Sequence, residues 1–215
     1  MTIPHLLNLG VHIGVGIVGM ALGAAQLVLG KAGERHRRRG RWFMWAALLV
    51  TGSAFIGLVA FRFLPLFAVL TLLVTYVSVS GWRVARTRSA GPQGIDLAWT
   101  VLAAAAATAL VPILIEAPHV GSSRPVVVWS ALGALAFVLA YDGARWTFPR
   151  AWFQRLWLPE HIYKVVSALS GMVSAFVGNV VEWGQPWSQV APSALGLFLI
   201  AYFMTQAATL KWRYE

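Results

Sequence analysis

The stretch KAGERHRRRGR, residues 31–41, separates two long apolar runs at residues 5–29 and 42–61. About 20 consecutive apolar residues are enough for a helix to cross the hydrocarbon core of a membrane. The same alternation of apolar runs and short polar segments continues along the 215 residues. It predicts seven membrane-spanning helices, near residues 5–29, 42–61, 64–82, 96–115, 126–145, 160–182 and 191–210.

Positive charge falls in every second segment between the apolar runs. Of the 17 Lys and Arg residues, 15 lie within 31–41, 83–88, 145–164 and 211–213, and only Arg62 and Arg124 lie in the alternate segments. Short cytoplasmic loops of membrane proteins carry the excess of Lys and Arg. We therefore expect the N-terminus outside and the C-terminus in the cytoplasm. Basic loops also attract the anionic lipid headgroups of the cytoplasmic face.

The composition agrees with a membrane protein and argues against a soluble one. Hydrophobic residues make up 59% of the chain and charged residues only 11%, whereas a soluble domain has about 25% charged residues. The sequence predicts a single all-α domain over residues 1–215, a polytopic transmembrane helix bundle. The formal net charge of +10 is explained by the loops, so we expect no nucleic-acid partner. The absence of cysteine excludes disulfides and thiolate metal sites.

One face of the first predicted helix is polar or small along its whole length. His5, His12, Gly19 and Gln26 are spaced by seven residues, so they share a helix face. One interpretation is a close helix–helix contact in which His12 and Gln26 are hydrogen-bonded. The other is a cofactor or quinone pocket lined by His12, since a polar residue inside a membrane is costly and marks a candidate functional site.

The sixth predicted helix carries a similar stripe. Its members are His161, Ala168, Ala175 and Glu182, with Asn179 beside them. The first and sixth helices run in opposite directions in the predicted topology. If the two stripes pack on each other, His12 lies level with Asn179, and Gln26 lies level with His161.

Imidazole and carboxylate groups gather at the predicted cytoplasmic end. His36, Asp142 and His161 are candidate ligands for a divalent metal ion, and a histidine there could ligate the iron of haem b. The alternative is that Asp142 and Glu160 pair with nearby arginines and hold no metal. Apart from His12, we expect no ionisable residue deep in a helix, and we expect Lys164 near the interface. This argues against an ion-coupled carrier.

Motifs of enzymatic chemistry are missing from the sequence. It contains no HExxH motif, no GxSxG motif and no glycine-rich phosphate loop. We therefore assign no catalytic residue, and the sequence favours a protein that is not an enzyme.

Two blocks of sequence carry a resemblance to a known family. The first runs from His12-Ile13-Gly14 through Gly19, Gly23 and Gln26 to the HRRRGR stretch at residues 36–41, and the second runs from the EHIYKV stretch at residues 160–165 to Ala175-Phe176 and Asn179. They resemble the "H…G…G..Q…HRxxGR" and "EHixRM…AF..N" motifs of a bacterial family of predicted multi-pass membrane proteins of unknown function. Lys164 and Val165 stand where that family has arginine and methionine. The resemblance implies a cytoplasmic-membrane location and a shared polar core.

These observations lead to one main hypothesis and two alternatives. The main hypothesis is an integral membrane protein whose first and sixth helices form a polar site near the cytoplasmic side, for haem, a metal ion or a quinone. The candidate cofactor-binding residues are His12, Gln26, His36, His161 and Asn179. The first alternative is an accessory or assembly subunit of a larger membrane complex, with other membrane subunits as partners. The second is a small-solute transporter.

Overall fold

The computed structural model describes residues 2–29, 33–116, 125–180, 184 and 187–209, the side chain of Gln189 excepted. Over these residues the chain forms α-helices and short 3-10 turns, with no strand. The α-helices are α1 (Ile3–Val28), α2 (Gly33–Ala60), α3 (Pro65–Thr87), α4 (Gly94–Glu116), α5 (Pro125–Ala144), α6 (Phe153–Val180) and α7 (Trp187–Thr209). All seven are long and apolar enough to cross a membrane. The predicted all-α transmembrane bundle is thus confirmed, and the protein is a multi-pass membrane protein.

Three helices begin at least four residues earlier than the apolar runs predict. α2 begins at Gly33 rather than 42, α6 at Phe153 rather than 160, and α7 at Trp187 rather than 191. The apolar run marks only the part of a helix that lies in lipid, and arginine is a good helix former that continues the helix beyond it. Pro159 and Pro192, which adjoin the predicted starts at 160 and 191, both lie inside their helices. Transmembrane helices tolerate such prolines because neighbouring groups satisfy the freed carbonyls.

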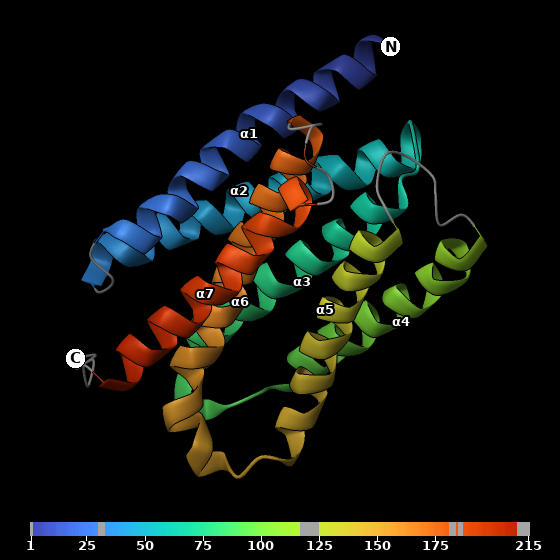
Figure 1. The fold of residues 1–215 in the computed structure, drawn as a ribbon. Helices are drawn as coiled ribbons and strands as arrows, with labels where there is room; N and C mark the ends of the chain where they lie inside the picture. The colour runs from blue at the N-terminus through green and yellow to red at the C-terminus, as the bar shows by residue number, and fades with distance from the viewer. Residues whose placement is uncertain (1, 30–32, 117–124, 181–183, 185–186, 210–215) are drawn as a thin grey trace.

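Consecutive helices run antiparallel, so the helix ends sort into two groups (Figure 1). The C-terminal ends of α1, α3, α5 and α7 lie together with the N-terminal ends of α2, α4 and α6. We call this the basic end, because the described residues of the basic segments 31–41, 83–88 and 145–155 lie there. Lys31, Arg124, Lys211 and Arg213 lie outside the described residues.

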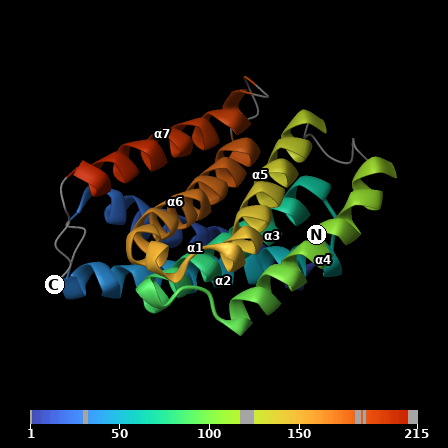
Figure 2. The ribbon, with the colours of Figure 1, turned by 90° about the horizontal axis from the view of Figure 1, so that it is seen from below.

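α3 occupies the centre of the bundle. It packs against α2, α4, α5 and α6, and Val69, Tyr76 and Val77 on it are fully buried. Figure 2 shows α1 and α2 on one side of α6, with α7 on the other. The main hydrophobic core gathers around α3, from Phe43 in α2 to Leu135 in α5 and Met172 in α6.

α1 packs closely on α2 and α6 through two glycines. A Cβ atom at Gly19 would lie 2.8 Å from the Met172 side chain, and one at Gly23 would lie 2.6 Å from the Leu169 side chain. Small residues at a helix contact allow such a close approach of the two backbones.

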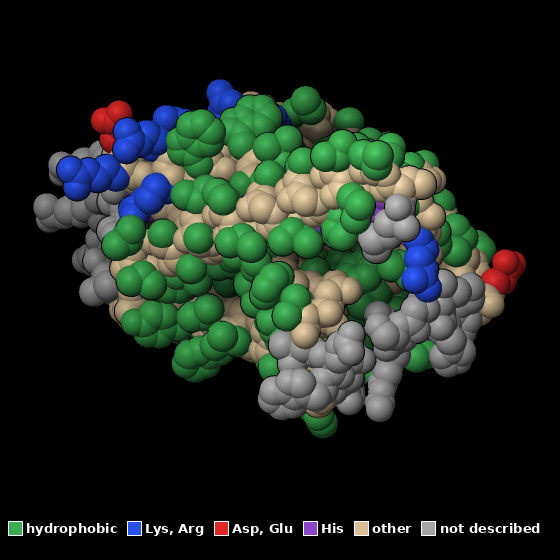
Figure 3. Space-filling model, turned by 90° about the horizontal axis from the view of Figure 1, so that it is seen from above, with side chains coloured by type: hydrophobic (Ala, Val, Ile, Leu, Met, Phe, Trp, Pro, Cys, Tyr) green, Lys and Arg blue, Asp and Glu red, His purple; other side chains and the backbone are tan. Residues whose placement is uncertain are grey.

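The outer surface is apolar over most of the bundle. Figure 3 shows hydrophobic side chains covering the visible face, with Lys and Arg side chains gathered mainly at one end. Large apolar side chains such as Phe137 and Phe198 are 73% and 67% exposed. Water-soluble proteins rarely expose large apolar patches, so this surface suits contact with lipid.

Candidate functional site

A groove of about 580 Å³ lies between α1, α2, α3 and α6, in the half of the bundle away from the basic end. Its walls are mostly apolar, and its few polar side chains include Asn8, His12 and Asn179. Small-molecule sites in proteins are typically clefts of about 300–1,000 Å³ with apolar walls and a few placed polar groups. Ile13, Ile17, Phe176 and Val180 line the groove and are also exposed on the outer surface. The groove is therefore accessible from the lipid phase.

The polar contacts of α1 in this groove are made to α2. His12 Nδ1 lies 2.9 Å from Ser53 Oγ and 3.2 Å from the carbonyl oxygen of Val50. Asn8 Nδ2 donates to the carbonyl oxygen of Ser53 at 3.0 Å. For His12, the structure therefore confirms the first interpretation of the α1 stripe, a hydrogen-bonded contact between two helices.

These contacts favour a proton on Nδ1 of His12. A carbonyl oxygen only accepts hydrogen bonds, so the Ser53 hydroxyl donates to Val50 O, 2.8 Å away. The hydroxyl oxygen of Ser53 and the carbonyl oxygen of Val50 then both act as acceptors toward His12. This arrangement favours a hydrogen on Nδ1, and a neutral His12 then keeps an unprotonated Nε2. That atom can accept a hydrogen bond or ligate a metal.

Asn179 lies in the same groove but on α6. Its Nδ2 donates to the carbonyl oxygen of Ala175 at 2.7 Å, one turn earlier in the helix. His12 and Asn179 are thus two sequence-predicted site residues that the structure brings to one groove. Glu182, the last member of the predicted α6 stripe, lies outside the described residues.

The other predicted site residues lie toward the basic end. Gln26 Nε2 donates to the carbonyl oxygen of His36 at 3.0 Å, which joins α1 to α2. His161 Nδ1 donates to the carbonyl oxygen of Gly81 in α3 at 3.0 Å. Gln26 therefore bonds to α2 and His161 to α3. The five candidates fall into two pairs and one separate residue, and they do not converge on one site.

The candidate metal ligands also have other partners. Asp142 is bound by Lys164, and His161 is bound to Gly81. Across the described ranges, no group of three or more His, Cys, Asp or Glu side chains is placed to hold a metal ion. The alternative interpretation, in which Asp142 and Glu160 pair with nearby arginines, agrees with the geometry for Glu160, whereas the close partner of Asp142 is Lys164.

A buried ionic cluster joins α5 and α6 near the basic end. Lys164 Nζ donates to both carboxylate oxygens of Asp142, at 2.6 and 2.7 Å. Arg145 Nε donates to Glu160 Oε1 at 3.0 Å, and Arg145 Nη2 forms an ion pair with Glu160 Oε2 at 2.8 Å. The side chains of all four residues are at most 5% exposed. Two cationic and two anionic groups make the cluster electrically balanced.

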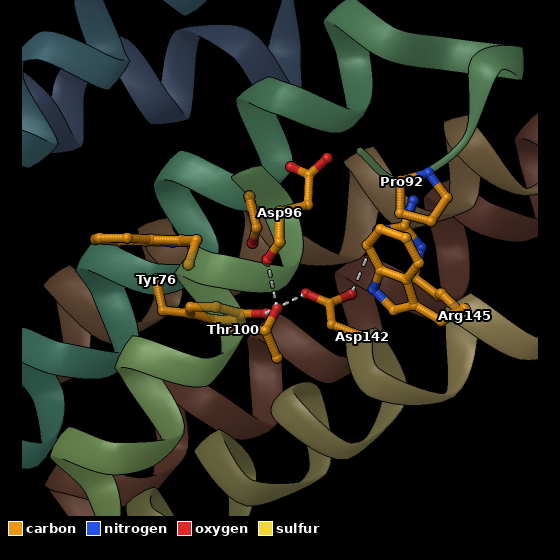
Figure 4. A pocket seen from close by; sticks show the side chains of 9 residues that line it. Tyr76, Pro92, Asp96, Thr100, Asp142 and Arg145 are labelled. Carbon is orange, nitrogen blue, oxygen red and sulfur yellow. Dashed lines mark hydrogen bonds and ion pairs between the residues drawn. The ribbon is translucent and has the colours of Figure 1, made fainter. Parts of the chain in front are cut away.

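Hydroxyl groups complete this cluster. Tyr76 of α3 donates to Asp142 Oδ2 at 2.6 Å, and its hydroxyl lies 2.9 Å from that of Thr100 in α4. Tyr141 donates to Glu160 Oε1 at 2.8 Å. Figure 4 shows Tyr76, Thr100 and Asp142 converging from three helices. The cluster therefore links α3, α4, α5 and α6 by polar contacts.

This cluster corrects one sequence-based expectation. His12 is not the only ionisable residue in the interior, since Lys164 is fully buried and Asp142 and Glu160 are buried beside it. Lys164 is buried because it faces α3 and α5, where a Cβ atom at Gly81 would lie 2.9 Å from its Cβ atom and Asp142 binds its ammonium group. The missed signal was the spacing of opposite charges, Asp142 with Arg145 at three residues and Glu160 with Lys164 at four, which puts each pair on one helix face.

No protein family model matches the chain, and comparisons with characterised proteins and with solved structures give no match.

Proposed function

We propose that this protein resides in the bacterial cytoplasmic membrane and binds a hydrophobic ligand with a hydroxylated ring, of the quinol class, in the groove beside His12. One observation carries the proposal. His12 lines a mostly apolar groove while its Nδ1 is held as a donor to Val50 and Ser53. Its Nε2 is then the acceptor that a phenolic hydroxyl requires.

The walls of the groove support this class of ligand. An apolar tail fits walls built from residues such as Leu9, Met20 and Phe67. The exposed residues Ile17 and Phe176 at the groove edge allow entry from lipid, where such a ligand dissolves. With the predicted topology, the groove lies in the outer half of the membrane, away from the predicted cytoplasmic site.

A haem in the same groove is less well supported. His5 is the nearest further histidine along α1, and it lies two turns away, about 10 Å along the axis. Its ring stacks on Phe61 at 4.6 Å between ring centroids. His5 and His12 therefore do not form a pair of axial ligands for one haem iron. A quinol needs only one hydrogen-bond acceptor.

Three variants of His12 separate binding from folding. In His12→Asn the amide Nδ2 takes the place of the Nδ1 donor, but nothing replaces Nε2. In His12→Gln the amide reaches the position of Nε2 instead. His12→Leu removes both groups and leaves Ser53 and Val50 without this partner.

The test is the thermal unfolding midpoint of detergent-purified protein with and without a short-tailed quinol. We expect the quinol to stabilise the wild type, and we expect His12→Asn to remain folded but to lose this ligand-dependent shift. Val18→Asn, on a lipid-exposed position of α1, is the control and should keep the shift. No quinol-dependent shift in the wild type, or an equal shift in His12→Asn, would contradict the proposal.

A further inference from the structure

A small cavity lies beside the ionic cluster, between α3, α4 and α5 (Figure 4). Its volume is about 10 Å³, and Pro92 closes it on the side of the α3–α4 connection. A cavity of about 10–15 Å³ on this measure holds one water molecule, provided that two to four polar groups face it. The size therefore admits one water and nothing larger.

Two polar side chains lining the cavity lack a hydrogen-bond partner. They are Ser80, whose Oγ is buried, and Trp99, whose Nε1 is buried. Within the described part of the chain, neither atom finds an acceptor or donor. Ser80 is only 6% exposed, and leaving a buried polar group unpaired costs about 1–3 kcal/mol. Ser80 Oγ and Trp99 Nε1 would therefore both be stabilised by a hydrogen-bond partner inside the cavity.

A third observation comes from the ionic cluster itself. Arg145 Nη1 lies 3.7 Å from Asp142 Oδ1, which is too long for a direct hydrogen bond. Both residues line the same cavity. A polar contact longer than about 3.5 Å is commonly bridged by water.

We propose that this cavity binds one internal water molecule that connects α3, α4 and α5. The water accepts hydrogen bonds from Trp99 Nε1 and from Arg145 Nη1. It donates one hydrogen bond to Asp142 and one to Ser80 Oγ. All four hydrogen-bonding positions of the water are then used.

A neutral ligand is required because the charges around the cavity are already balanced. Asp142 and Glu160 are matched by Lys164 and Arg145. Asp96, which also lines the cavity, is paired with Arg83. A bound cation or anion would leave an uncompensated buried charge, whereas water adds none.

The water also extends the polar network of the Asp142–Lys164 pair. Tyr76 and Lys164 bind the Asp142 carboxylate from α3 and α6. The internal water adds a bond from the carboxylate toward Trp99 of α4. The ion pair is then connected to the side of the bundle closed by Pro92, at the basic end.

The first test is infrared spectroscopy of the purified protein in H₂¹⁶O and H₂¹⁸O. An internal water gives an O–H stretching band that shifts with the oxygen isotope. We expect Trp99→Phe to remove or displace one such band, and we expect the exposed control Trp45→Phe to leave it unchanged. An isotope-sensitive spectrum identical in the wild type and Trp99→Phe would overturn the proposal.

A second pair of variants guards against misfolding of Trp99→Phe. Ser80→Ala keeps the cavity and removes one bond, so the water band should move but persist. Ser80→Val fills the cavity with methyl groups, so the band should disappear. An experimental structure that resolves other internal waters should show one within 3.2 Å of Trp99 Nε1. Direct protein partners for Ser80 and Trp99 at that position would count against the water.

Discussion

Lys164 and Asp142 form a buried ion pair in which the ammonium group contacts both carboxylate oxygens, at 2.6 and 2.7 Å. Lys164 is fully buried and Asp142 is 4% exposed. The ion pair links α6 to α5, and a hydrogen bond from the hydroxyl of Tyr76 links α3 to the same carboxylate. A buried pair of this kind is costly to break from one side, because the remaining charge is left without a partner.

Lys164→Met should therefore destabilise the protein more than a double change that removes both charges. The single variant leaves two carboxylates beside one guanidinium, and we expect a loss of about 3–5 kcal/mol. The double variant Asp142→Asn/Lys164→Met leaves Arg145 and Glu160 paired, and the asparagine oxygen still accepts from Tyr76. Unfolding free energies in mixed micelles measure both. A double variant that is less stable than Lys164→Met would show that the unpaired Asp142 carboxylate is not the cause of the destabilisation.

Gly23→Val should weaken the docking of α1 on the bundle. A Cβ atom at this position would lie 2.6 Å from Leu169 Cδ1 and 3.0 Å from Phe43 Cε2. Overpacking of this kind typically costs about 1–3 kcal/mol, visible as a lower thermal unfolding midpoint. Gly10→Val, on the same helix, is the matched control, because a Cβ atom there meets no atom within 4 Å. Equal effects of the two changes would mean that α1 does not pack in this register.

Gly81→Val should disturb the contact between α3 and α6 at the ionic cluster. A Cβ atom at Gly81 would lie 2.9 Å from Lys164 Cβ, which cannot move without shifting α6. The same glycine provides the carbonyl oxygen for His161. We expect a loss of stability of about 1–3 kcal/mol. Gly133→Val in α5, where a Cβ atom meets nothing within 4 Å, should be tolerated.

The helices could be predicted from the sequence because each one carries its own signal. An apolar run such as residues 96–115 reports its burial in lipid without reference to any neighbour. The starts of α2 and α6 could not be read in this way, because helix propensity continues through the arginines and tryptophans outside the lipid. The stripe that contains Gly19 predicted a close contact of the first helix but did not name Leu169 and Met172 as partners.

The polar contacts were harder to predict than the helices, because each depends on which helices are neighbours. The stripe on α1 marked His12 correctly as a residue facing the bundle. Its partners Val50 and Ser53 lie on α2, which carries no matching stripe in the sequence. The Asp142–Lys164 pair was missed because the predicted sixth helix begins at 160, which put Lys164 in its second turn and suggested a position near the interface.

The orientation of the bundle in the membrane is a further prediction, and the absence of cysteine makes it directly testable. Ser89 is exposed at the basic end, and Glu116 is exposed at the opposite end of α4. Because Lys and Arg concentrate in cytoplasmic loops, Ser89→Cys should react with a membrane-impermeant maleimide only after the cells are permeabilised. Glu116→Cys should react in cells whose outer membrane has been made permeable and whose cytoplasmic membrane is intact. The reverse labelling pattern would place the basic end, and with it the ionic cluster, on the outer side.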